Sequence, residues 1–80
     1  MNPEDIESAL SAHPEILMAT VQGDGRHYEL TIVSNQFRDL SKLKRQLWVY
    51  GLLKDSIISG QMHAVQLHTW TEEEWEKKIG

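Results

Sequence analysis

The longest regular hydrophobic pattern in the chain lies between Phe37 and Ile58. Apolar residues recur there at steps of four, three, three and four, so they share one stripe of an α-helix. This stripe consists of Leu43, Leu47, Tyr50, Leu53 and Ile57. Ser41 is placed to cap the start of this helix, and Gly60 stands where a left-handed C-terminal cap would lie. The pattern predicts a long helix whose apolar stripe packs in the core.

The segment before this helix predicts a short helix followed by a β-hairpin. Pro3 suits the first position of a helix, and Pro14 ends that helix because it disfavours helical geometry in the residue before it. Apolar and polar residues alternate over 15–22 and again over 27–33, as in half-buried strands. The turn between them, 23–26, has the sequence GDGR, which is typical of a tight hairpin connection.

The segment after the long helix predicts one more strand and one more helix. Residues 61–68 alternate again, and a right-handed crossover would place this strand parallel to its predecessor. Thr71 and Glu74 have the spacing of a capping box, which begins a last helix anchored by Trp75. The prediction is a single α+β domain over 1–80, of order αββαβα, with helices against one face of a three-stranded mixed sheet.

The composition narrows the classes of function. Twelve acidic against eight basic residues give a net charge of −4, which argues against a constitutive nucleic-acid or membrane binder. The absence of cysteine excludes disulfides, thiolate metal ligands and thiol nucleophiles. No apolar run is long enough to span a bilayer, and the N-terminus is too acidic for a signal peptide. We therefore expect a cytoplasmic protein without a membrane partner.

No arrangement of residues typical of an enzyme is present. The glycine-containing turn at 23–26 does not lead from a strand into a helix, as a phosphate-binding loop would. The carboxylates gather towards the two ends of the chain, and no nucleophile motif surrounds a serine or histidine. We therefore expect no enzymatic activity.

Two histidines are candidate metal ligands. His27 opens the second predicted strand and His63 opens the third, so both could lie at one edge of the sheet. Neutral imidazole suits iron, zinc or copper, but two histidines make an incomplete site that a partner would have to complete. From the spacing alone, a partly buried His63 bonded to backbone is the favoured interpretation. His13 and His68 are expected to be solvated or structural.

An ordered set of short motifs resembles the BolA-like proteins, and most closely the IbaG branch. The family pattern is approximately FxGxSxVxRHxxVY, followed by HAL and TPxEW. The pieces that match it here are GDGRHYEL, Phe37, Ser41, Lys44-Arg45, Val49-Tyr50, Met62-His63-Ala64 and 71–75. Asp39, Gln46 and Glu72 depart from it, standing where the pattern has glycine, histidine and proline.

This resemblance implies a fold similar to class II KH domains and a specific partner. BolA-like proteins pair with monothiol glutaredoxins and share a [2Fe-2S] cluster, to which the glutaredoxin brings a cysteine and bound glutathione. His63 matches the family's histidine ligand, and His27 is the candidate for the second ligand, which comes from the hairpin. The implied function is an adaptor in iron–sulfur trafficking and in iron, redox or acid stress. The chain alone would hold no cluster and be a monomer or a weak homodimer.

The alternative function is that of a KH-like transcriptional regulator that binds nucleic acid. The basic residues of the long helix would then contact phosphates, with Trp48 nearby for stacking. These residues are Lys42, Lys44, Arg45 and Lys54. The GxxG loop with which KH domains clamp the nucleic-acid backbone is absent from the chain.

Overall fold

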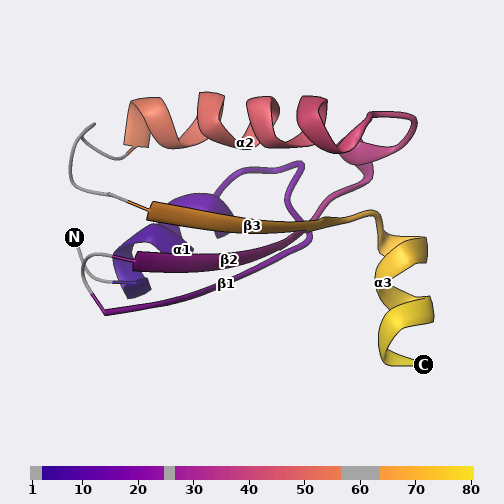
Figure 1. Ribbon diagram of the computed structural model, residues 1–80, viewed down its shortest axis with the longest axis horizontal. Coiled ribbons are helices and arrows are strands. Elements are labelled where there is room, and N and C mark those ends of the chain that lie inside the picture. Colours follow the sequence, from indigo (N-terminus) through magenta and orange to yellow (C-terminus); the bar gives the residue numbers. More distant parts are fainter. Residues whose placement is uncertain (1–2, 25–26, 57–63) are drawn as a thin grey trace.

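The computed structural model describes residues 3–24, 27–56 and 64–80 and confirms the predicted order of elements (Figure 1). The elements are α1 (Pro3–Ser11), β1 (Met18–Gly23), β2 (His27–Val33), the 3-10 turn η1 (Asn35–Phe37), α2 (Lys42–Ser56), β3 (Ala64–Trp70) and α3 (Glu72–Ile79). Strand β3 runs two residues beyond the predicted end at His68, while the predicted cap Gly60 lies outside the described residues. No helix in the described part of the chain is long and apolar enough to cross a membrane.

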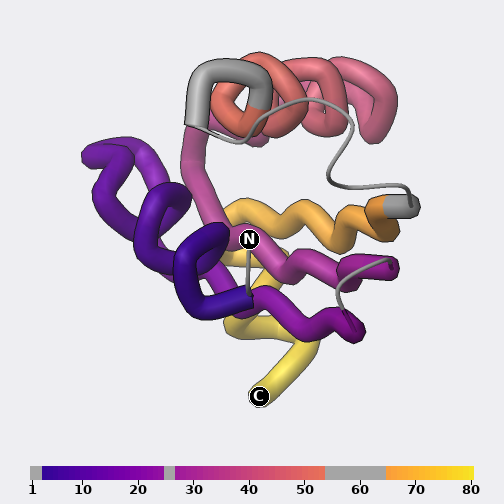
Figure 2. Tube along the Cα trace, turned by 90° about the vertical axis from the view of Figure 1, so that its left-hand side faces the viewer, coloured from indigo at the N-terminus to yellow at the C-terminus, as the bar shows by residue number. Residues whose placement is uncertain are grey.

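The sheet is mixed, with β2 in the centre. Strand β1 pairs antiparallel with β2, and β3 pairs with β2 in parallel, as the crossover through α2 requires. The register aligns Val21 with Leu30 and Leu30 with Leu67, so one face of all three strands is apolar. Helices α1 and α2 lie on this inner face (Figure 2), where Ile6 of α1 and Val49 of α2 are fully buried.

Of the apolar stripe predicted for α2, Leu53 faces the core and Leu43, Leu47 and Tyr50 do not. Leu43, Leu47 and Tyr50 are 65 %, 60 % and 44 % exposed, whereas Val49 is fully buried and Leu53 nearly so. Ile57 lies outside the described residues. The helix is apolar on more than one side, so its period alone cannot tell which side meets the sheet. The contacts with α1 and β3 decide this, and they place Val49 and Leu53 in the core while Leu43, Leu47 and Tyr50 stay at the surface.

Helix α3 does not cover the inner face with the other helices. It leaves the end of β3 (Figure 1), and its Trp75 packs on Trp70 with ring centroids 6.2 Å apart. Trp70 lies on the outer face of the sheet, because side chains alternate along β3 and Leu67 points into the core. The predicted capping box at Thr71 and Glu74 is confirmed. The tilted Trp70–Trp75 contact, together with Lys78 Nζ over the Trp70 ring at 5.0 Å, joins this helix to the outer face.

Candidate functional site

The beginnings of β2 and β3 lie side by side at one end of the sheet. His27 is the first residue of β2, and its register partner is Ala64, the first residue of β3. In the sequence Ala64 directly follows His63, which itself lies outside the described residues. The parallel pairing therefore brings the strand that begins after His63 next to His27.

The hairpin turn holds His27 at the surface. Its backbone N–H donates to Asp24 Oδ1 at 2.8 Å, and its Nδ1 lies 3.6 Å from Asp24 Oδ2. Gly23 is the residue before Asp24. A Cβ atom at Gly23 would come within 2.7 Å of the Tyr28 ring and 2.8 Å of the His27 carbonyl oxygen. The His27 side chain is 71 % exposed. A carboxylate near Nδ1 favours the tautomer that leaves Nε2 available as a ligand atom.

The surface beside His27 is a shallow pocket rather than an enclosed cavity. It has a volume of about 270 Å³ and is bordered by the turn, by Glu29 of β2 and by Gln66 of β3. Within the described ranges, no group of three or more histidine or carboxylate side chains could hold a metal ion. Any metal held here would need ligands beyond the described side chains.

The other two histidines have contacts within the chain. His13 meets Trp48 edge-on at 5.4 Å and its Nδ1 accepts from the Glu15 N–H at 3.1 Å, so it is less solvated than expected. His68 Nε2 lies 3.2 Å from Glu29 Oε1 on the outer face. His68 pairs with Thr31, four residues along β2 from His27, so it is remote from the turn.

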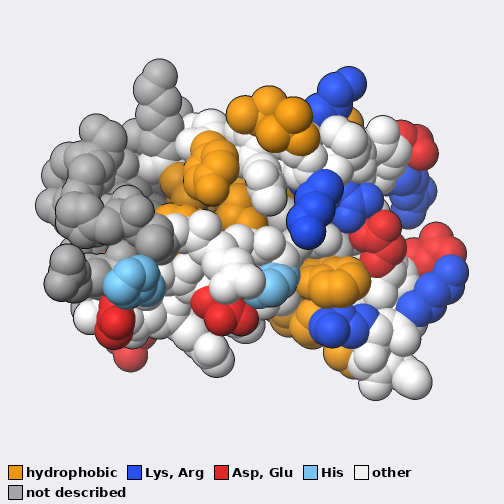
Figure 3. Space-filling model, in the orientation of Figure 1, with side chains coloured by type: hydrophobic (Ala, Val, Ile, Leu, Met, Phe, Trp, Pro, Cys, Tyr) orange, Lys and Arg blue, Asp and Glu red, His pale blue; other side chains and the backbone are white. Residues whose placement is uncertain are grey.

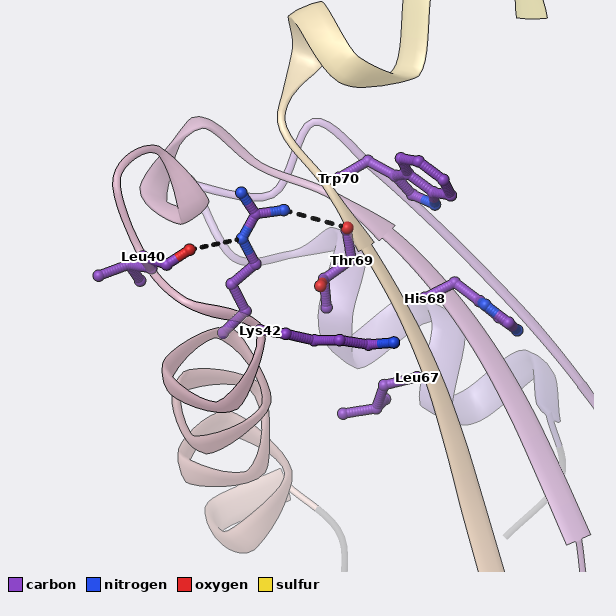
Figure 4. A pocket seen from close by; sticks show the side chains of 7 residues that line it. Leu40, Lys42, Leu67, His68, Thr69 and Trp70 are labelled. Atoms are coloured by element: carbon purple, nitrogen blue, oxygen red, sulfur yellow. Dashed lines mark hydrogen bonds between the residues drawn. The ribbon is translucent and has the colours of Figure 1, made fainter. Parts of the chain in front are cut away.

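The basic face predicted for α2 is smaller than expected, because Arg45 points inward. Its Nε donates to the Leu40 carbonyl at 3.1 Å and its Nη1 to the Thr69 carbonyl at 3.3 Å (Figure 4). Its guanidinium also pairs with both carboxylate oxygens of Glu74, and the side chain is only 14 % exposed. These hydrogen bonds, with one from the Thr71 N–H, lower the pKa of Glu74 from 4.5 to about 2.

The remaining basic residues offer little for nucleic acid. Lys42 borders a pocket of about 370 Å³ between α2 and β3 (Figure 4), and Lys44 is exposed. The side chain of Lys54 lies outside the described residues. Trp48, proposed for stacking, packs edge-on against Phe37 at 5.5 Å and is partly buried. The sequence shows the positive charge of Arg45 on this helix, but its partner Glu74 is 29 residues away and comes close only in the folded chain.

Comparisons with known proteins agree with this fold. A family model described as BolA-like protein matches residues 5–74. The acid stress protein IbaG of Escherichia coli (strain K12) is 33 % identical over 75 residues, which cover 94 % of this chain and 89 % of that protein. The DNA-binding transcriptional regulator BolA of Haemophilus influenzae is 35 % identical over 54 residues, 68 % of this chain and 52 % of that protein.

A solved structure supports the same assignment. The structure of a BolA protein homologue from Coxiella burnetii superimposes with a TM-score of 0.80 at 28 % identity, covering 95 % of this chain and 97 % of that one. The family model spans residues 5–74, and IbaG is 33 % identical to this chain. The chain therefore belongs to the BolA-like family and to its IbaG branch.

Proposed function

We propose that this chain is an adaptor that pairs with a monothiol glutaredoxin and shares a [2Fe-2S] cluster with it through His63 and His27. The observation that carries the proposal is the register of β2 and β3, which pairs His27 with the residue that follows His63. The adaptor would act in iron–sulfur trafficking and in the response to iron, redox or acid stress. The IbaG relative is named an acid stress protein, which supports the last of these roles.

The donor chemistry at the hairpin fits such a shared cluster. Imidazole is a known ligand of [2Fe-2S] iron in place of cysteine, and this chain has no cysteine. The pocket is open, so a second protein can approach His27 and supply the remaining ligands. Asp24 accepts from the His27 backbone N–H and lies 3.6 Å from its Nδ1, and Gly23 allows the turn to close against Tyr28. When bound, the cluster would supply electron transfer or be handed on as cargo.

DNA binding is the second candidate, because the Haemophilus relative is named a DNA-binding transcriptional regulator. Two observations weigh against it: Arg45 is occupied by Glu74 and two carbonyls, and the net charge is −4. Phosphate attraction through Lys42 and Lys44 alone would give weak binding with a shallow salt dependence, of slope about −2 in a double-logarithmic plot. A steeper slope, lost in a Lys42→Ala, Lys44→Ala variant, would favour the regulator function instead.

The test is visible absorption and circular dichroism of the chain mixed with a monothiol glutaredoxin, glutathione, ferrous iron and sulfide. We expect a spectrum distinct from that of the glutaredoxin alone, lost in His63→Ala and altered in His27→Ala. His68→Ala is the matched control, since His68 contacts Glu29 and is remote from the turn, and it should leave the spectrum unchanged. A spectrum identical to that of the glutaredoxin alone, in all four samples, would refute the cluster role.

A further inference from the structure

The outer face of α2 carries an apolar stripe that the core does not use. Leu43, Leu47 and Tyr50 are about half exposed or more, and they are spaced at i, i+4 and i+7. Figure 3 shows apolar side chains at the surface over this helix, next to Lys and Arg. Single exposed apolar residues are ordinary, but a contiguous stripe on a helix marks an interaction site. This spacing is the one by which helices present anchors to a partner.

Gly51 adds an independent observation on the same face. It lies in the middle of α2, four residues after Leu47, and is exposed. A Cβ built at this position meets nothing within 4 Å. Glycine inside a helix costs about 1 kcal/mol relative to alanine, and packing within the described chain does not require it. Gly51 follows Leu43 and Leu47 in the same i, i+4 row of the helix. Because Gly51 has no side chain, another helix can approach α2 closely at this position.

The charges beside the stripe indicate the chemistry of what binds there. Lys42 and Lys44 flank Leu43 on either side of the helix, and neither forms an ion pair with any residue that the structure describes. The chain as a whole is acidic. The stripe therefore has an apolar centre and a positively charged border. It is complementary to a partner surface that has an apolar centre and a negatively charged border.

We propose that the outer face of α2 binds an amphipathic helix of another protein. The apolar side of that helix packs along Leu43, Leu47 and Tyr50, it approaches closely at Gly51, and its carboxylates pair with Lys42 and Lys44. Three side chains offer much less than the roughly 1,200–2,000 Å² of a stable interface, which suits one docked helix better than a permanent homodimer. The proposal does not depend on the cluster or on the glutaredoxin.

The test uses a synthetic peptide of about five helical turns, with leucines at i, i+4 and i+7 and glutamates on both sides of them. Amide chemical shifts of the ¹⁵N-labelled chain are followed during titration. We expect changes concentrated over 42–51, with affinity that falls several-fold as salt rises. A control peptide with lysine in place of each glutamate should bind at least five-fold more weakly.

Variants of the chain separate binding from folding. Leu47→Gln should abolish the shifts, while Leu17→Gln, which changes a leucine 53 % exposed outside α2, should retain them. Gly51→Ala should raise the melting temperature and yet weaken binding, a combination that a purely structural glycine would not give. Three outcomes would overturn the proposal: no localised shifts at millimolar peptide, equal binding of the lysine peptide, or dilution-dependent shifts without peptide that vanish in Leu47→Gln. The last would assign the face to a second copy.

Discussion

Arg45 of α2 and Glu74 of α3, 29 residues apart in sequence, form a two-pronged ion pair with N–O distances of 2.8 and 3.1 Å. The same guanidinium donates to the carbonyls of Leu40 and Thr69. One side chain thus connects the loop before α2, the end of β3 and the first turn of α3. Glu74 in turn accepts from the Thr71 N–H at 2.8 Å, so the ion pair and the helix cap share one carboxylate.

Replacing Arg45 should destabilise the fold well beyond the loss of a surface charge. Arg45→Met removes the donor to two carbonyls and the cationic partner of Glu74, which keeps only the Thr71 N–H, and we expect a loss of about 2–3 kcal/mol in the free energy of unfolding by urea. Arg45→Lys keeps the charge without the planar fork and should recover only part of this. Lys44→Met, next to it on the exposed side, is the control and should change stability by less than about 0.5 kcal/mol. Equal effects of both methionine variants would contradict the role given to Arg45.

The lowered pKa of Glu74 predicts that the stability of the fold depends on pH. Its pKa is about 2 in the folded chain against 4.5 ordinarily, mainly because of Arg45, so the folded state favours the ionised form. This contribution is fully present above pH 4.5 and is lost as the pH falls towards 2. Since the side chain is 43 % exposed, solvent screening limits the effect to about 1–2 kcal/mol. Urea unfolding of Glu74→Gln between pH 6 and 2 should show a shallower decline than the parent chain; parallel declines would rule the pair out as the cause.

Asp39 predicts an unusual response to substitution. Its φ is 65°, in the left-handed region, where the family pattern has glycine. Aspartate tolerates this geometry better than most side chains, and β-branched residues tolerate it worst. Asp39→Val should therefore lower stability by about 1–2 kcal/mol, whereas Asp39→Gly should stay within about 1 kcal/mol of the parent. Thermal unfolding measures both, and a valine variant as stable as the glycine one would contradict the strain.

The two sides of α2 predict opposite results for similar leucine truncations. Leu53→Ala removes a side chain that is 6 % exposed and should cost about 2–4 kcal/mol through lost burial and a cavity. Leu47→Ala removes a side chain that is 60 % exposed and should lower the free energy of unfolding by less than about 1 kcal/mol. Both leucines belong to the stripe predicted from the sequence, so urea unfolding of the two variants checks which part of that stripe supports the core. A larger loss for Leu47→Ala than for Leu53→Ala would contradict the burial of Leu53.

Local features of this protein could be read from the sequence. The hairpin follows from period-two alternation around a glycine turn, the start of α2 from Ser41, whose hydroxyl accepts from the Lys44 N–H at 3.2 Å, and the start of α3 from the capping box. Each depends on contacts between residues a few positions apart, so the sequence contains both partners of every interaction. The family assignment rests on the order and spacing of such motifs.

Longer-range features were decided by the tertiary structure. The side of α2 that enters the core, the inward turn of Arg45 and the packing of Trp75 on the outer face depend on what the sheet and α1 present at that point. The pairing of His27 with Ala64 likewise arises from strand register across the crossover. A sequence period defines the faces of an element but not its partner. The choice between two apolar faces is made by the burial that the whole fold achieves.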